Sequence, residues 1–155
     1  MDNYENAMKI MTERFSKDSL MAVATTDGER LHNRVVDVYY EDSVLYASTY
    51  ATSNKIKQIE SNPEVAVCAI DWFSGHGIGK NLGWVLDPKN AEIREKLRKA
   101  FVWYDDVTNE NDQNSCFLEI RLTDGMLIKD HHAIRYQIDF LNKSALLSEN
   151  WGEFK

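Results

Sequence analysis

One stretch of the sequence gathers side chains that can bind an anion. Between residues 34 and 63 it holds a set of cationic and neutral hydrogen-bond donors: Arg34, Ser48, Thr49, Ser53, Asn54 and Lys55. Arginine presents a planar, permanently charged fork of donors. Lys55 falls in the first turn of an expected short helix, where free backbone N–H groups also favour an anion. The pattern predicts a site for a phosphate monoester; the alternative is that Arg34 and Lys55 are solvated surface charges.

Two strands, a turn and a short helix must position these donors. Residues 34–40 and 44–49 are rich in β-forming residues, and the polar residues 41–43 between them predict a hairpin. Ser53 is a suitable N-cap for a helix whose apolar edge is Ile56 and Ile59, and Pro63 ends it. The hairpin is expected to bring Arg34 toward the far end of the second strand. Arg34 and the helix N-terminus would then face one pocket.

A longer pattern runs through the same stretch. It consists of three pieces: Arg34-Val35-Val36, Tyr46-Ala47-Ser48-Thr49, and Ser53-Asn54-Lys55-Ile56-Lys57-Gln58-Ile59 followed by Asn62-Pro63. This pattern resembles the flavin-binding signature of the pyridoxamine 5′-phosphate oxidase-like family, and the likeness runs from about residue 20 to residue 140. The resemblance implies a mainly β (α+β) fold, a small antiparallel split β-barrel with peripheral helices. It also implies a homodimer that binds FMN at the subunit interface.

The resemblance assigns roles to the residues of the pattern. It implies that Arg34, Lys55, Ser48 and Thr49 hold the FMN phosphate, with Ser53 and Asn54 as further donors. It implies that backbone groups of Val35 and Val36 reach the edge of the flavin ring. Ser74 corresponds to a position where some members place a polar contact to the isoalloxazine ring. The sequence indicates no acid, base or nucleophile, so no catalytic residue is predicted.

The implied activity is that of an FMN-dependent oxidoreductase in which NAD(P)H reduces the flavin and a small acceptor is reduced in turn. True pyridoxamine phosphate oxidases carry a tryptophan and an Arg-x-His segment after the last strand, whereas no arginine or histidine follows residue 140 here. The chain therefore looks more like the general stress protein and nitroimidazole-resistance branches. The alternatives are a flavin-binding stress-response protein without turnover, or a relative that binds haem or a deazaflavin. The small number of histidines argues against haem.

Composition narrows the class of protein. A length of 155 residues predicts a single domain over residues 1–155, and a net charge of −7 argues against a nucleic-acid partner. No apolar run is long enough to span a membrane, and the polar N-terminus is unlike a signal peptide, so a cytoplasmic location is expected. Cys68 and Cys116 each fall in an apolar strand pattern, which predicts buried, reduced thiols.

The remaining elements are expected to build the barrel over about residues 19–140. An amphipathic helix is predicted at residues 2–17, with a capping box formed by Asp2 and Glu5. Strands are predicted at 65–73, 115–122 and 126–129, with a turn at 123–125 between the last two, and residues 141–155 are predicted to be a polar tail.

Two further motifs have residue types that occur in binding sites, but neither fits one. The glycine-rich residues 74–80 do not fit a phosphate-binding P-loop, because Ser74 occupies the first glycine position and Asn81 follows Lys80. Adjacent histidines in a strand point to opposite faces, so His131 and His132 form a poor pair of ligands and no metal site is predicted.

Overall fold

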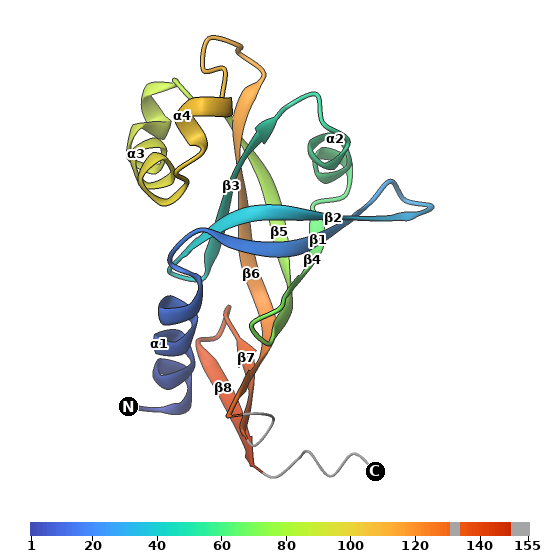
Figure 1. The fold of residues 1–155 in the computed structure, drawn as a ribbon. Helices are drawn as coiled ribbons and strands as arrows, with labels where there is room; N and C mark the ends of the chain where they lie inside the picture. The colour runs from blue at the N-terminus through green and yellow to red at the C-terminus, as the bar shows by residue number, and fades with distance from the viewer. Residues whose placement is uncertain (131–133, 150–155) are drawn as a thin grey trace.

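The chain forms a closed antiparallel barrel, here in a computed structural model that describes residues 1–130 and 134–149. The strands are β1 (Ser19–Thr26), β2 (Leu31–Glu41), β3 (Val44–Tyr50), β4 (Glu64–Ala69), β5 (Phe73–Trp84), β6 (Ser115–Lys129), β7 (Ile134–Asp139) and β8 (Ser144–Glu149). Their order is β3-β2-β1-β4-β5-β6-β7-β8, and β3 also pairs with β6. Six strands therefore close into a barrel, and β7 and β8 extend the sheet beyond it (Figure 1). The expected split barrel is confirmed.

Helices lie on the outside of this barrel. They are α1 (Asn3–Phe15), α2 (Asn54–Ser61), the 3₁₀ turn η1 (Pro88–Asn90), α3 (Ala91–Ala100) and α4 (Tyr104–Val107). Asp2 accepts a hydrogen bond from the Glu5 N–H while the Glu5 carboxylate accepts one from the Asp2 N–H, so the capping box is confirmed. None of the helices in the described part of the chain is long and apolar enough to cross a membrane.

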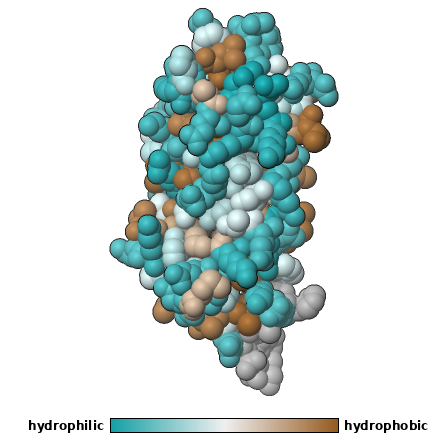
Figure 2. All heavy atoms as spheres, turned by 90° about the vertical axis from the view of Figure 1, so that its left-hand side faces the viewer, coloured by the Kyte–Doolittle hydropathy of each residue, from teal (hydrophilic) through white to brown (hydrophobic). Residues whose placement is uncertain are grey.

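Two apolar cores hold these layers together. The larger core fills the barrel and takes in Met11 and Phe15 of α1. The smaller core lies between α3 and the sheet, where Leu97, Phe101 and Tyr104 pack against Phe117 of β6. These three side chains follow helical spacing, although α3 ends at Ala100 and Tyr104 begins α4. The charged side of α3 faces solvent, and the side of the molecule that carries α1 and α3 is largely hydrophilic (Figure 2).

Strand β6 is longer than the sequence suggests. The predicted turn at residues 123–125 is wrong, because β6 continues through these residues and pairs with β3, β5 and β7 along its length. Its register against β5 shifts between His76 and Gly77, which makes a bulge at this point. A Cβ on Gly125 would lie 2.5 Å from the Phe73 ring. The glycine therefore permits a close approach inside a strand and does not mark a turn.

The glycine-rich segment is also part of a strand. The predicted strand 65–73 is wrong at its end, since β4 stops at Ala69 and a tight connection follows in which Trp72 adopts a φ of +59°. Phe73 then begins β5, whose glycines 75, 77 and 79 face inward while Ser74 and His76 face outward. The glycines are needed because β5 lies very close to β6 and to α2.

Two other expectations need correction. Residues 144–149 of the predicted polar tail form β8, which pairs with β7. Cys116 is buried, and burial raises the pKa of its thiol to about 11, but Cys68 is exposed because it faces outward on β4. His131, His132, Trp151 and Phe154 lie outside the residues that the structure describes.

Candidate anion and cofactor site

The guanidinium of Arg34 lies at one end of the barrel, next to α2. Its Nη1 donates to the Thr25 hydroxyl at 2.7 Å and to the Val23 carbonyl at 3.2 Å. The same Thr25 hydroxyl donates to the Gln58 side chain of α2. A hydrogen-bonded chain therefore ties Arg34 on β2 to the short helix. The hairpin and the helix do face one region, as the sequence suggested.

Lys55 brings a second positive charge to the same region. Burial of its ammonium group lowers the pKa of Lys55, and the nearby charge of Arg34 lowers it further. Burial likewise lowers the pKa of Arg34. Among the described residues, no carboxylate lies within ion-pair distance of either cation. Two partly buried cations without a counter-ion are unfavourable, and an anion bound between them would remove that penalty.

The start of α2 adds an unsatisfied hydroxyl. Ser53 precedes the helix, yet its side chain makes no capping hydrogen bond. Its Oγ is buried and has no hydrogen-bond partner in the described part of the chain. Buried polar atoms are rarely left without a partner, because the cost is about 1–3 kcal/mol. The free N–H groups of the first turn, which begins at exposed Asn54, add to this set of donors.

The serine and the threonine of β3 point to opposite faces. Thr49 pairs with Cys116, whose thiol lies close enough to Lys55 for their charges to interact. Ser48 pairs instead with Phe117 and shares its face with the core beneath α3. The structure therefore places Thr49 on the face of β3 that lies toward Lys55 and turns Ser48 to the opposite face. We call Arg34, Thr49, Ser53 and Lys55 the α2 cluster.

One edge of β2 is open beside the α2 cluster. Strand β3 pairs with β2 only at residues 39–41 and then continues along β6. No described strand pairs with that edge of β2 over residues 31–38, which include Val35 and Val36. Their backbone groups on this edge can therefore hydrogen-bond to a ligand. The side chain of Val36 is buried, whereas that of Val35 is 67% exposed on the outside of the barrel.

Outward-facing side chains form a continuous row across seven strands. Strand pairing places the following residues side by side: Val35, Ala22, Cys68, Ser74, Met126, Gln137 and Leu146. We call the part of the row on β2, β1 and β4 the outer strand face. The same face also carries Leu20, Ala24, Ala66 and Ile70. Ser74 lies where this face meets the second half of the row. It is therefore on the opposite side of the sheet from Thr25, which Arg34 contacts.

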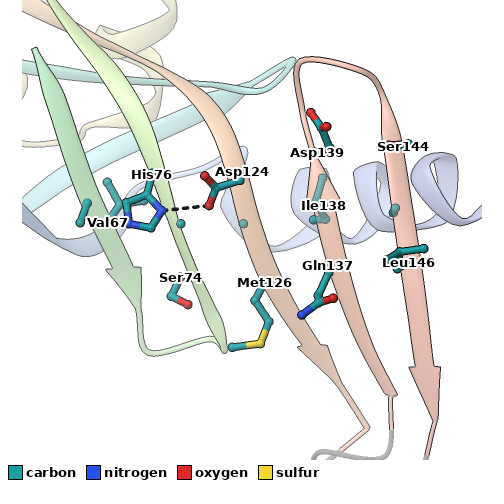
Figure 3. Close-up of a pocket in the computed structure, with 14 residues that line it drawn as sticks. Val67, Ser74, His76, Asp124, Met126, Gln137, Ile138, Asp139, Ser144 and Leu146 are labelled. Atoms are coloured by element: carbon teal, nitrogen blue, oxygen red, sulfur yellow. Dashed lines mark hydrogen bonds and ion pairs between the residues drawn. The ribbon is translucent and has the colours of Figure 1, made fainter.

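The second half of the row lines a groove of about 760 Å³ between β5 and β8. Figure 3 shows Ser74, Met126, Gln137 and Leu146 along it, with a histidine and an aspartate at one side. His76 Nδ1 lies 2.9 Å from Asp124 Oδ1, and this contact raises the pKa of His76. Sequence reasoning missed both residues, because it placed Asp124 in a turn. The alternation of Ser74 and His76 with glycines was the available signal.

Comparison with known proteins bears on the fold. No protein-family model matches the chain, and no curated sequence matches it. Solved structures do match. General stress protein 26 from Bacillus anthracis is 19% identical, with a TM-score of 0.60 over 93% of this chain and 98% of that one. A NimC/NimA family protein from Clostridium acetobutylicum is 18% identical, with a TM-score of 0.59 over 91% of each chain.

A third match supplies the name of the fold. A pyridoxamine 5′-phosphate oxidase-related, FMN-binding protein from Nostoc punctiforme is 13% identical, with a TM-score of 0.58 over 96% of this chain and 97% of that one. The chain has the pyridoxamine 5′-phosphate oxidase-like split-barrel fold. Further solved structures that match include a FAD-binding protein from Mesorhizobium loti and an F420 reductase. At sequence identities of 13–19%, the similarity to these structures shows the fold of this chain and nothing about its activity.

Proposed function

We propose that this split barrel binds FMN and that the bound flavin carries electrons from NAD(P)H to a small acceptor. The observation that carries the proposal is the α2 cluster. Arg34 and Lys55 are partly buried, interact with each other and have no carboxylate partner in the described part of the chain, and the buried Ser53 hydroxyl beside them is unsatisfied. A phosphate monoester would supply the missing negative charge and acceptor oxygens.

The chain's own groups would hold the two ends of FMN in different ways. Lys55 and Arg34 would bind the phosphate through charge, with Thr49, Ser53 and the first N–H groups of α2 as neutral donors. The open edge of β2 at Val35 and Val36 would hydrogen-bond to the ring. Ser74 lies three strands away from Val35 on the outer side of the sheet, so in a homodimer it would contact the ring held by the other subunit. Bound flavin would supply the hydride chemistry, so the protein contributes position and electrostatics.

Comparison of FMN with riboflavin tests the phosphate site directly. Two charge-assisted contacts of about 1.5–3 kcal/mol each predict that FMN binds at least about 100-fold more tightly than riboflavin. Quenching of flavin fluorescence during titration of the purified protein measures both dissociation constants. Equal affinities, or no quenching by FMN, would contradict the proposal. Titration with FAD and with a deazaflavin compares the cofactors that the names of similar split barrels suggest.

Electron transfer is tested on the FMN-loaded protein. NADPH or NADH added without oxygen is expected to bleach the visible flavin absorbance, and a small acceptor is expected to restore it. A yellow protein that neither nicotinamide reduces would instead be a flavin-binding protein without turnover.

We also propose a homodimer with the flavin ring between the subunits. The outer strand face exposes apolar side chains that a monomer would leave in water, including Val35, Leu20 at 59% exposure and Ile70 at 90%. Its centre consists of Ala22, Ala24, Ala66 and Cys68, which are small enough for another sheet to approach closely. A second copy of this chain would cover the face and one side of the bound ring.

The exposed thiol of Cys68 reports on this dimer. Labelling by iodoacetamide is expected to modify Cys68 in dilute protein and to slow as protein concentration rises through the dimer dissociation constant. Cys116 is buried and serves as an internal control that reacts only on unfolding. A Cys68→Ser variant identifies the labelled site. Labelling that is independent of concentration, together with a monomer mass at high concentration, would contradict the dimer.

A further inference from the structure

The groove between β5 and β8 contains a histidine in an arrangement suited to donate a proton. Asp124 accepts a hydrogen bond from Nδ1 of His76, so the other ring nitrogen, Nε2, is left for a ligand. The side chains of His76 and Asp124 are 54% and 61% exposed, which gives solvent protons access to the ring. The bulge in β6 sits at this point, and the Thr123 hydroxyl donates to the His76 carbonyl at 3.2 Å. The strand pairing thus fixes the ring beside the groove.

The groove walls indicate what kind of molecule would fit. Met126 and Leu146 provide apolar surface, while Ser74 and Gln137 provide hydrogen-bonding groups. The charged groups that face His76 are carboxylates: Asp124 on β6, Asp139 on β7 and Glu64 on β4. Anionic ligands are disfavoured by these charges, so an uncharged acceptor is the better match. Ser74 lines the groove, so in the proposed homodimer the groove would adjoin the flavin ring held by the other subunit.

We propose that this groove is the acceptor subsite of the split barrel and that His76 protonates the bound acceptor during its reduction, with Asp124 as its positioning residue. This inference rests on the proposed flavin-dependent function. It assigns His76 as a catalytic residue, and it places the acceptor on the outer side of the sheet, between Ser74 and β8.

Reduction of a quinone illustrates the balance of the step. Conversion of a quinone to its hydroquinone takes up two electrons and two protons. A hydride from the reduced flavin brings both electrons and one of the protons to one oxygen. The second oxygen then carries the negative charge, and it takes the proton from Nε2 of the His76 imidazolium as that N–H bond breaks. The neutral imidazole regains a proton from water, and the flavin is left oxidised.

The pH dependence of acceptor reduction follows from the contact between His76 and Asp124. The Asp124 contact raises the pKa of His76 above its usual value of 6.5. Acceptor reduction should therefore be fast where His76 is charged and should fall as pH rises through this raised pKa. Asp124→Asn removes the cause of the shift, so the fall is expected at lower pH. A hydrogen bond from the Asn142 side chain lowers the pKa of Asp139, so this carboxylate keeps its charge through the range in which His76 titrates.

The test uses the FMN-loaded protein with duroquinone as acceptor, because this fully substituted quinone does not alkylate Cys68. After anaerobic reduction by NADPH, stopped-flow absorbance follows flavin reoxidation by duroquinone. In His76→Gln the reoxidation rate at pH 7 is expected to fall about 100-fold and to lose its pH transition. FMN binding and flavin reduction by NADPH are expected to match the native protein. His32→Gln is the matched control. His32 forms a similar pair, with Nε2 lying 3.2 Å from Asp27 Oδ2, and neither residue lines the groove.

A second readout does not depend on turnover. NMR titration of the protein without flavin is expected to give a raised pKa for the His76 ring, lower in Asp124→Asn, and duroquinone is expected to shift signals of Met126, Gln137 and Leu146. A native reoxidation rate and pH profile in His76→Gln would overturn the inference alone while flavin binding stands. Duroquinone shifts confined to other parts of the chain would also overturn it. Loss of FMN binding by the native protein would overturn the proposed function together with this step.

Discussion

Replacing Lys55 with methionine is expected to weaken FMN binding roughly 10- to 150-fold without lowering the stability of the free protein. The loss corresponds to one charge-assisted phosphate contact of about 1.5–3 kcal/mol. Stability is expected to hold or rise, because burial and the charge of Arg34 both disfavour the Lys55 ammonium. Flavin fluorescence gives the affinity, and urea unfolding gives the free energy of unfolding.

Two comparisons make this result specific. Lys57→Met changes an exposed lysine on the same helix and should leave both affinity and stability unchanged. Arg34→Met should reduce affinity and also stability, since Arg34 donates to Thr25 and Val23. A Lys55→Met protein that binds FMN normally, or that unfolds more easily than the native protein, would remove Lys55 from the proposed site.

The Lys55→Met substitution should also change how the free energy of unfolding depends on pH. Because the folded-state pKa of Lys55 lies below its unfolded value of 10.5, the unfolded chain binds more protons as pH approaches 10.5 from below. The Lys55 contribution to stability therefore becomes more favourable with rising pH in that range. Cys116 acts in the opposite direction between its unfolded value of 9.0 and about 11. The difference between the native and Lys55→Met stability curves isolates the lysine, and a constant difference from pH 7 to 10.5 would contradict the assignment.

Gly75→Ala is expected to produce the largest loss of stability. A Cβ at this position would lie 2.4 Å from the Asp124 carbonyl oxygen and 3.1 Å from the Phe73 ring. A backbone oxygen in a paired strand cannot move aside without disturbing β6, so the cost should reach or exceed about 3 kcal/mol. Urea unfolding measures this change. The displaced Asp124 should also release His76, which NMR would report as a lower pKa of the ring.

Gly79→Ala provides a graded comparison on the same strand. The three atoms nearest to its Cβ would be side-chain atoms of Ile59, at 2.9 Å or more, and a side chain can shift more easily than a backbone. We expect a clearly smaller loss than for Gly75→Ala. Equal losses, or a stable Gly75→Ala protein, would show that β5 and β6 do not approach as closely as described.

Local features of this protein could be predicted because neighbouring residues control them. The capping box at Asp2 and Glu5 needs only residues three apart, and the burial of Ile56 and Ile59 follows from helical spacing. The turn between β2 and β3 lies at Asp42 and Ser43, which adopt positive φ angles as a tight hairpin requires. A sequence pattern also predicted the candidate phosphate ligands. In the structure, two of them, Arg34 and Lys55, lie close together at the same end of the barrel.

Other features depend on contacts between residues distant in sequence. Alternation along β3 separates Ser48 from Thr49, but only the pairing with β6 shows which of them faces Lys55. His76 and Asp124 are 48 residues apart, and their contact requires β5 and β6 to pair in one register with a bulge. Thr123-Asp124-Gly125 has the composition of a turn, yet pairing with β5 and β7 keeps it in a strand, because ending β6 there would leave β7 without a partner. Local propensity is worth about 1 kcal/mol a residue, whereas the pairing of a whole strand is worth more, so the sheet overrides the local preference.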